Sequence, residues 1–265
     1  MTWVAKMRTV GVLGGMGPEA TVLLMSRVIA LTAATDDSDH VPMLIDNNTQ
    51  VPSRIKALIE KTGEDPGPVL VAMARRLAAA GAEALAMPCN TAHYYAPLLK
   101  ESISLPFLDM IELTVDYLVG LPGYSDSSGC LQVGMQASPA VKITGVFDRA
   151  FANHRLQPVY PPDQDALLAC IREIKAAGQS AAAVELLQAV TTKLLREGVD
   201  LLLVACSELS LLNRSLPREI RMVDSIDVLA RAILDFSRDG RPRIDKACPK
   251  IPDDVGLNRN SRTSG

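Results

Sequence analysis

The sequence predicts an α/β fold of two similar αβα domains with mostly parallel sheets, related by a pseudo-twofold axis. Short apolar runs alternate along the chain with longer stretches of helical periodicity, a pattern typical of parallel strands covered by helices. The second half of the chain also repeats the order of apolar runs, glycines and cysteines found in the first half. At 265 residues, 48% of them hydrophobic, the chain is long enough for two such units.

Eight apolar runs are the expected strands, and helical stretches lie between several of them. The runs cover residues 9–14, 41–46, 82–88, 105–110, 131–137, 156–161, 199–206 and 220–225. The clearest helical stretches are residues 66–81 and 180–198, and each ends in a glycine, Gly81 or Gly198, as helices commonly do.

The internal repeat sets the expected domain boundaries. Three pairs of residues keep the same offset between the halves: Leu77 with Leu194, Gly81 with Gly198, and Cys89 with Cys206. The segments PFLDMIE and RMVDSID then follow at nearly the same distance, so an internal duplication explains the pattern better than the general likeness of α/β proteins. We expect one αβ domain in residues 8–110 plus about 224–237, carrying Cys89, and a second in residues 111–223, carrying Cys206. Residues 238–265 are polar and rich in Pro and Gly, which predicts a flexible tail.

Composition excludes several classes of function. The net charge is −3, which offers no basic surface for nucleic acid. No apolar run is long enough to span a bilayer, and the N-terminal residues lack the apolar core of a signal peptide, so we expect a cytoplasmic protein without a membrane partner. The five cysteines are widely spread and form no CxxC pair, which predicts neither a disulfide framework nor a structural metal site.

A glycine-rich loop follows the first apolar run, in the segment VGVLGGMGPEATVLL. Counted from Gly15 it comes close to the dinucleotide fingerprint, but Asp46, at the end of the second strand, comes too late for that site. Gly14, Gly15 and Gly17 precede Pro18, a residue suited to the first turn of a helix. The loop therefore predicts either a site for a small anion, such as a carboxylate, or a tight turn without a ligand.

Cys89 and Cys206 each follow an apolar strand and precede a helix-like segment. This position is the carboxyl edge of a parallel sheet, where ligands bind and where free N–H groups and a helix dipole lower the pKa of a thiol. Taken singly, each cysteine is typical of a small buried hydrophobe. Matched positions in two facing domains would instead place the two sulfurs on opposite sides of one cleft.

Two opposed thiols suit one kind of chemistry. One thiolate removes the α-proton of a carbon acid, and the other thiol delivers a proton to the opposite face, which inverts the stereocentre without a cofactor. No feature marks a Schiff-base lysine for pyridoxal phosphate, so the sequence predicts no cofactor.

Several motifs resemble the aspartate/glutamate racemase superfamily. They are VGVLGGMGPEAT, MPCNTAH and CSE, which include the glycine loop and both cysteines. The segment NNTQVPSR is similar to one found in the branch of pyridoxal-phosphate-independent aspartate and broader amino-acid racemases. The resemblance covers about residues 8–236, and it implies two αβα domains, an active site between them and a homodimer.

The resemblance also implies roles for individual residues. Cys89 and Cys206 match the two catalytic thiols, and Arg54 matches an arginine that binds the side-chain carboxylate of the substrate, a task suited to its bidentate fork. The other substrate-binding candidates are Met16, Gly17, Asn90, Thr91, Ser138, Lys175, Ser207 and Glu208. The candidates for tuning the thiols are His93 and Glu208.

Some of these residues also have a plainer interpretation. His93 can bond a backbone carbonyl, Glu208 can complement the positive end of a helix, and Lys175 can be a surface lysine. The sequence also departs from the branch: Ser138 replaces a threonine, while Val141 and Phe147 stand where a threonine and a tyrosine are usual. Lost hydroxyls in this segment bear on the substrate more than on the reaction class.

The expected function is a cofactor-independent racemase of an acidic amino acid, aspartate first and glutamate second. Its partner is a small-molecule amino-acid or dicarboxylate substrate. One alternative is another carbon-acid enzyme of the superfamily, of the hydantoin racemase or maleate isomerase type. A second alternative is a protein that binds a small carboxylate without turnover.

Overall fold

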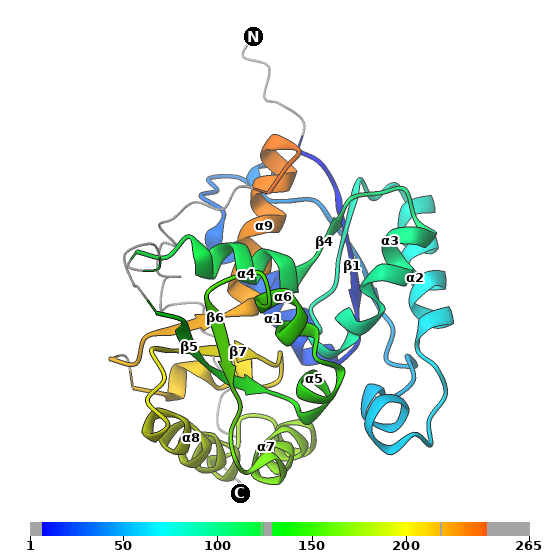
Figure 1. Cartoon of the computed structure of the whole chain (residues 1–265). Helices are drawn as coiled ribbons and strands as arrows, with labels where there is room; N and C mark the ends of the chain where they lie inside the picture. The colour runs from blue at the N-terminus through cyan, green and yellow to red at the C-terminus, as the bar shows by residue number, and fades with distance from the viewer. Residues whose placement is uncertain (1–6, 123, 125–128, 218, 243–265) are drawn as a thin grey trace, which may run out of the picture.

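The structure is a computed structural model, and it describes residues 7–122, 124, 129–217 and 219–242 (Figure 1). Most of the expected tail, residues 243–265 with Cys248, lies outside the described residues. The tail expected after about residue 238 stays a prediction; helix α9 (Ser225–Asp239) continues to Asp239, and Gly240 caps it with a left-handed φ of 76°.

The first sheet has four parallel strands in the order β2-β1-β3-β4. The strands are β1 (Val10–Gly14), β2 (Met43–Asn47), β3 (Ala84–Ala86) and β4 (Phe107–Leu108). The α-helices of this half are α1 (Pro18–Leu31), α2 (Gly67–Ala79), α3 (Ala96–Ser102) and α4 (Met110–Val119).

The second sheet repeats this arrangement, with four parallel strands in the order β6-β5-β7-β8. The strands are β5 (Leu131–Ala137), β6 (Leu156–Val159), β7 (Leu201–Ala205) and β8 (Met222–Asp224). Besides α9, its α-helices are α5 (Pro139–Thr144), α6 (Val146–Phe151), α7 (Gln164–Ala177) and α8 (Ala181–Arg196). Each of the eight apolar runs therefore forms a strand, and the predicted fold class is confirmed.

Short helices complete the chain between these elements. The 3-10 helices are η1 (Asp37–Asp39), η3 (Thr91–Tyr95), η4 (Leu209–Leu211) and η5 (Asn213–Ser215), and η2 (Lys56–Glu60) is a π-helix. The two helices predicted to end in glycine, α2 and α8, precede Gly81 and Gly198, whose φ angles are 97° and 74°. These positive φ values explain the glycines, because other residues rarely adopt them.

Both sheets are buried on both faces, which explains why their strands are continuous apolar runs. Along β7, Leu201 and Leu203 face a central hydrophobic cluster, whereas Leu202 faces an outer cluster under α7 and α8. The first sheet shares the central cluster, to which Val12 of β1 contributes. Helices α1, α4 and α9 supply much of this central layer between the sheets (Figure 1).

Helix α9 joins the two halves. It follows β8 in the second sheet but packs mainly against α1 and α4 of the first half. An ion pair of 3.1 Å between Arg27 of α1 and Asp227 of α9 lies in this contact. The assignment of residues 224–237 to the first domain stays a prediction, since β8 itself pairs with β7.

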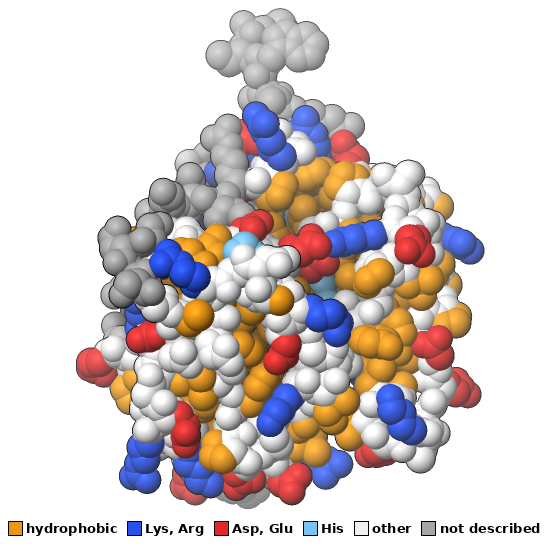
Figure 2. Space-filling view, in the orientation of Figure 1, with side chains coloured by type: hydrophobic (Ala, Val, Ile, Leu, Met, Phe, Trp, Pro, Cys, Tyr) orange, Lys and Arg blue, Asp and Glu red, His pale blue; other side chains and the backbone are white. Residues whose placement is uncertain are grey.

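The surface carries both signs of charge. On the face shown in Figure 2, lysine and arginine side chains are interspersed with aspartate and glutamate side chains. Within the described ranges, none of the helices is long and apolar enough to cross a membrane.

Candidate active site

The two thiols lie at corresponding places in the two sheets. Cys89 comes just after β3, and Cys206 comes directly after β7. Each strand is an inner strand of its sheet, so both thiols lie at the carboxyl edge, as the sequence predicts. Both side chains are buried, with 6% of each residue exposed.

The predicted lowering of the thiol pKa values is wrong. Burial raises the pKa of Cys89, and burial together with the Glu208 carboxylate raises the pKa of Cys206 well above its usual value. The backbone N–H groups of Ala92 and Leu209 act in the lowering direction but are outweighed. The segments after the thiols are the short 3-10 helices η3 and η4, rather than α-helices with a large dipole.

Three charged side chains surround the thiols. The Cys206 thiol donates a hydrogen bond to Glu208 Oε2 at 3.3 Å, and Lys175 Nζ forms an ion pair of 2.9 Å with Glu208 Oε1. After burial, the Arg54 guanidinium is the largest influence on the pKa of Cys89 and lowers it, while Glu208 raises it and Lys175 lowers it. The structure therefore brings Lys175 and Glu208, from the second half, near both thiols, and Arg54, from the first half, near Cys89.

Lys175 interacts electrostatically with both thiols. Burial lowers the pKa of its ammonium, but Glu208, Cys206 and Cys89 raise it, and the net direction is upward. Its side chain is 45% exposed and that of Glu208 is 12% exposed. Lys175 is thus a partly exposed member of the site rather than an isolated surface lysine.

Arg54 is held by the backbone of its own loop. Its Nη1 donates to the carbonyl oxygens of Val51 at 3.2 Å and Pro52 at 2.8 Å. These bonds fix the guanidinium of this half-buried residue, whose charge lowers the pKa of Cys89.

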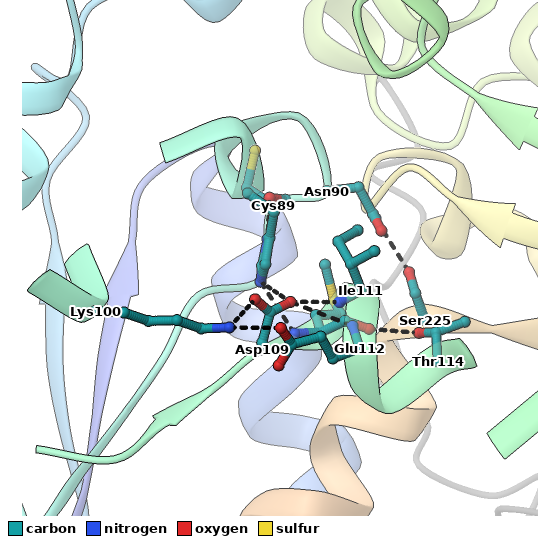
Figure 3. A network of polar contacts seen from close by, with 10 residues as sticks. Cys89, Asn90, Lys100, Asp109, Ile111, Glu112, Thr114 and Ser225 are labelled. Carbon is teal, nitrogen blue, oxygen red and sulfur yellow. Dashed lines mark hydrogen bonds and ion pairs between the residues drawn. The ribbon is translucent and has the colours of Figure 1, made fainter. Parts of the chain in front are cut away.

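Hydrogen bonds link the segment after Cys89 to the second half of the chain. Asn90 Nδ2 donates to Ser225 Oγ at 3.0 Å, as Figure 3 shows, and the Thr91 and Ser138 hydroxyls lie 2.9 Å apart. Asn90 Oδ1 is buried and has no hydrogen-bond partner among the described residues. An acceptor left unpaired in this position is available to a ligand.

The glycine loop is explained largely by packing. A Cβ on Gly14 would lie 2.6 Å from Thr21 Cγ2, and a Cβ on Gly15 would lie 2.3 Å from the backbone of Asn48. A Cβ on Gly17 would lie 3.7 Å from Glu208 Oε1, so this part of the loop borders the site. Met16 is buried in the same hydrophobic cluster as Cys89. The anion site stays a prediction.

His93 contacts the backbone carbonyl of Cys89. This contact matches the plainer interpretation of the residue, a bond to the backbone, rather than direct tuning of the thiol. Its Nδ1 lies 2.9 Å from the Cys89 carbonyl oxygen, and the Met110 N–H donates to its Nε2 at 3.0 Å. Because Nε2 accepts, the proton lies on Nδ1, and the ring is a neutral donor to the carbonyl.

Two of the departures from the racemase branch lie in the core. Val141 and Phe147 are fully buried in the central cluster, and the Phe147 ring packs edge-on against Phe151 at a centroid distance of 5.7 Å. Their missing hydroxyls therefore alter core packing. Ser207 is also buried, and it lies between Cys206 and Glu208 in the sequence.

Sequence reasoning missed three residues that contact the thiol segments: Ser210, Asp224 and Ser225. Ser210 Oγ donates to Asp224 Oδ1 at 2.8 Å and lies 3.3 Å from the Cys206 carbonyl oxygen, while Ser225 holds Asn90. A signal was present, because Ser210 follows Cys206 by the same interval as His93 follows Cys89. Asp224 likewise matches the aspartate of the PFLDMIE segment.

The family model for Asp/Glu/Hydantoin racemase matches residues 13–233 of the chain. The chain belongs to this racemase family. The broad specificity amino-acid racemase RacX of Bacillus subtilis (strain 168) is 23% identical over 228 residues, which cover 84% of this chain and 95% of that protein.

Solved structures of racemases share the fold. The Picrophilus torridus aspartate racemase is 30% identical, with a TM-score of 0.77 over 90% of this chain and 96% of that one. The glutamate racemase of Francisella tularensis, solved with D-glutamate, is 14% identical, with a TM-score of 0.61 over 91% of this chain and 86% of that one. The second likeness supports the two-domain racemase fold alone.

No metal centre is evident in the part of the chain that the structure describes, where no three His, Cys, Asp or Glu side chains are grouped suitably for an ion.

Proposed function

We propose that this family member racemises an acidic amino acid, aspartate first and glutamate second, with Cys89 and Cys206 as the acid–base pair and without a cofactor. The observation that carries the proposal is that two buried thiols from matched strand ends share one set of charged groups. Lys175 and Glu208 act on both sulfurs, so a substrate beside these groups would be within reach of both.

The charges of the site support an acidic substrate. Arg54 and Lys175 are two cations and Glu208 is one anion, whereas aspartate or glutamate carries two carboxylates and one ammonium. Arg54 suits the side-chain carboxylate, because its guanidinium has further N–H groups besides those bonded to the loop carbonyls. The unpaired Asn90 Oδ1 suits an N–H donor such as the substrate ammonium.

Proton transfer begins with the ionisation of one thiol. The raised pKa values keep both thiols protonated at rest, and Glu208 Oε2 is positioned to take the Cys206 proton through their hydrogen bond. The Cys206 thiolate then removes the α-proton, and the Cys89 thiol delivers its proton to the opposite face. In the reverse direction Cys89 is the base, favoured as a thiolate by Arg54 and Lys175 once burial is overcome.

The test uses single enantiomers of aspartate and glutamate in D₂O, followed by NMR and optical rotation. We expect α-proton exchange with inversion, unaffected by dialysis, chelators or added pyridoxal phosphate. Hydantoins and maleate, assayed in parallel, test the related carbon-acid reactions. If aspartate and glutamate bind but neither exchanges its α-proton, the protein is a carboxylate-binding protein and the proposal fails.

Single thiol variants test the two-base mechanism. Cys89→Ser and Cys206→Ser should each stop racemisation, since a positioned acid or base contributes about 10²–10⁴-fold. Each variant should retain slow exchange for one enantiomer only, and the two should prefer opposite enantiomers. Cys130→Ser, at an exposed cysteine, is the matched control. Racemisation at the wild-type rate in either active-site variant would exclude the mechanism.

We also propose a homodimer, which rests on the family resemblance, and a cytoplasmic location, which rests on the sequence features described above. Light scattering during size-exclusion chromatography measures the mass in solution, and fractionation of the host cell locates the protein.

A further inference from the structure

We propose that two matching clamps hold the backbone of the two thiols and fasten both to one pair of helices. The first clamp is His93 with the N-terminus of α4 at Asp109 and Met110. The second clamp is Ser210 with Asp224, the residue that caps α9. These are positioning residues, and their catalytic consequence rests on the proposed two-thiol function.

The first clamp connects Cys89 to α4. His93 Nδ1 donates to the Cys89 carbonyl oxygen, and its Nε2 accepts from the Met110 N–H at the first residue of the helix. Asp109 lies 3.8 Å from Nε2 and caps α4 by accepting from the N–H groups of Ile111 and Glu112. Figure 3 shows the polar contacts of Asp109, including its ion pair of 2.9 Å with the exposed Lys100.

The second clamp connects Cys206 to α9 in the same way. The one proton of the Ser210 hydroxyl has two acceptors within reach, Asp224 Oδ1 at 2.8 Å and the Cys206 carbonyl oxygen at 3.3 Å, so the hydroxyl donates to both in a shared hydrogen bond. Asp224 caps α9 by accepting from the Ile226 N–H at 2.9 Å, and it also accepts from Asn213 Nδ2. Both Ser210 and Asp224 are buried.

The two clamps occupy equivalent places but use different chemistry. His93 and Ser210 each lie four residues after their cysteine, and Asp109 and Asp224 each cap the helix after the last strand of their sheet. The imidazole is long enough to reach the helix N–H itself. The serine hydroxyl is short, and it reaches the helix through the capping carboxylate.

Both clamps end on helices that pack against each other, α4 and α9. The separation of the two thiols is therefore linked to a rigid helix contact as well as to their loops. Asn90 adds a direct tie, because it bonds Ser225 at the first residue of α9 (Figure 3). Such a link matters for acid–base catalysis on opposite faces of one carbon, where a misplacement of about 1 Å can reduce the rate by about 10²-fold.

The second clamp is tested with Ser210→Ala against Ser237→Ala. Ser237 is an equally buried serine of α9 that donates to the Arg8 carbonyl oxygen, at the other end of the helix. We expect Ser210→Ala to lower kcat by about 10-fold, with little change in KM, because it displaces a reacting group without touching the substrate. Ser210→Thr keeps the hydroxyl and should restore most of kcat.

Thiol alkylation provides a readout that does not depend on turnover. Iodoacetamide modification of each cysteine is followed by mass spectrometry, with exposed Cys130 and buried Cys170 as internal references. Loss of one hydrogen bond should speed modification of Cys206 in Ser210→Ala by about 2- to 12-fold, the factor that corresponds to one net hydrogen bond. Cys89 and Cys170 should keep their rates.

The first clamp is tested with two substitutions at His93. Asn places an amide nitrogen near the position of Nδ1 and can still donate to the Cys89 carbonyl, whereas Gln places its polar atoms near Nε2. His93→Asn should therefore keep Cys89 alkylation closer to wild type than His93→Gln does, and Cys206 should be unaffected in both.

The clamps are supported if each substitution changes the alkylation rate only of the cysteine in its own half of the chain. Unchanged alkylation and kcat in Ser210→Ala relative to Ser237→Ala, or equal acceleration at both thiols, would overturn them. If the wild-type chain exchanges no α-proton at all, the proposed function fails, while the alkylation pattern still decides whether the clamps exist.

Discussion

Replacement of Glu208 by glutamine is the most informative perturbation of the site. It removes the negative charge that pairs with Lys175 at 2.9 Å and weakens the acceptor of the Cys206 thiol at 3.3 Å, while it preserves side-chain size. Breaking a buried charge pair costs roughly 2–5 kcal/mol, but Lys175 is 45% exposed, and solvent screening reduces this figure. We expect a loss of about 1–3 kcal/mol of transition-state stabilisation, or roughly 5- to 150-fold in kcat/KM.

The same substitution should shift the pH profile in a defined direction. After burial, the Glu208 charge is the largest cause of the raised pKa of Cys206, so its removal should lower that pKa. The limb of the kcat/KM profile that reports Cys206 ionisation should therefore move to lower pH. Racemisation of each enantiomer is measured by optical rotation across the pH range.

A matched control separates this effect from a general change in charge. Glu173→Gln alters a carboxylate on α7 that accepts from Ser180 and acts on the pKa of Cys170. It should leave kcat/KM and the pH profile at wild-type values. If Glu208→Gln behaves like Glu173→Gln in both measurements, Glu208 has no part in ionising Cys206 and the proposed proton path is wrong.

Three further outcomes are expected. Arg54→Ala should weaken the binding of aspartate and glutamate by roughly 2–5 kcal/mol, seen as a higher KM, and leave KM for neutral amino acids unchanged. Arg76→Ala, which breaks an exposed ion pair with Asp46, is the control and should leave every KM unchanged. Burial and the Asp227 charge raise the pKa of Asp224 to about 7. Between about pH 4 and 7 the folded chain therefore binds a proton that the unfolded chain does not, and the stability from this proton is lost as the pH rises through that window. Asp224→Asn should make the calorimetric Tm less dependent on pH between these values. A chain ending at Pro242 should keep wild-type activity and Tm, because α9 is complete there, and loss of either would assign a role to the tail.

The fold followed from local features of the sequence. The runs at residues 131–137 and 199–206 read as strands because consecutive apolar residues suit a sheet covered on both faces. Gly81 and Gly198 marked helix ends because few other residues adopt a positive φ.

The site was only partly predictable. The repeat and the motifs pointed to Cys89 and Cys206, because each follows an inner strand at the carboxyl edge of its own parallel sheet, and the family resemblance pointed to Arg54. Ser210 and Asp224 were missed, since a serine and an aspartate in these positions are common in any chain, and only the fold brings their side chains to 2.8 Å.

The sequence by itself determined the order of strands and helices and the correspondence of Cys89 with Cys206 in the two halves. Both depend on short-range patterns that recur at a fixed offset. Only the tertiary structure decided the direction in which the pKa values of the thiols shift. Their strand-end positions suggested lowered pKa values, but burial raises both, and Glu208 raises that of Cys206 further. Desolvation and Coulomb interactions depend on what the whole fold packs around an atom, and that environment includes residues far away in the sequence.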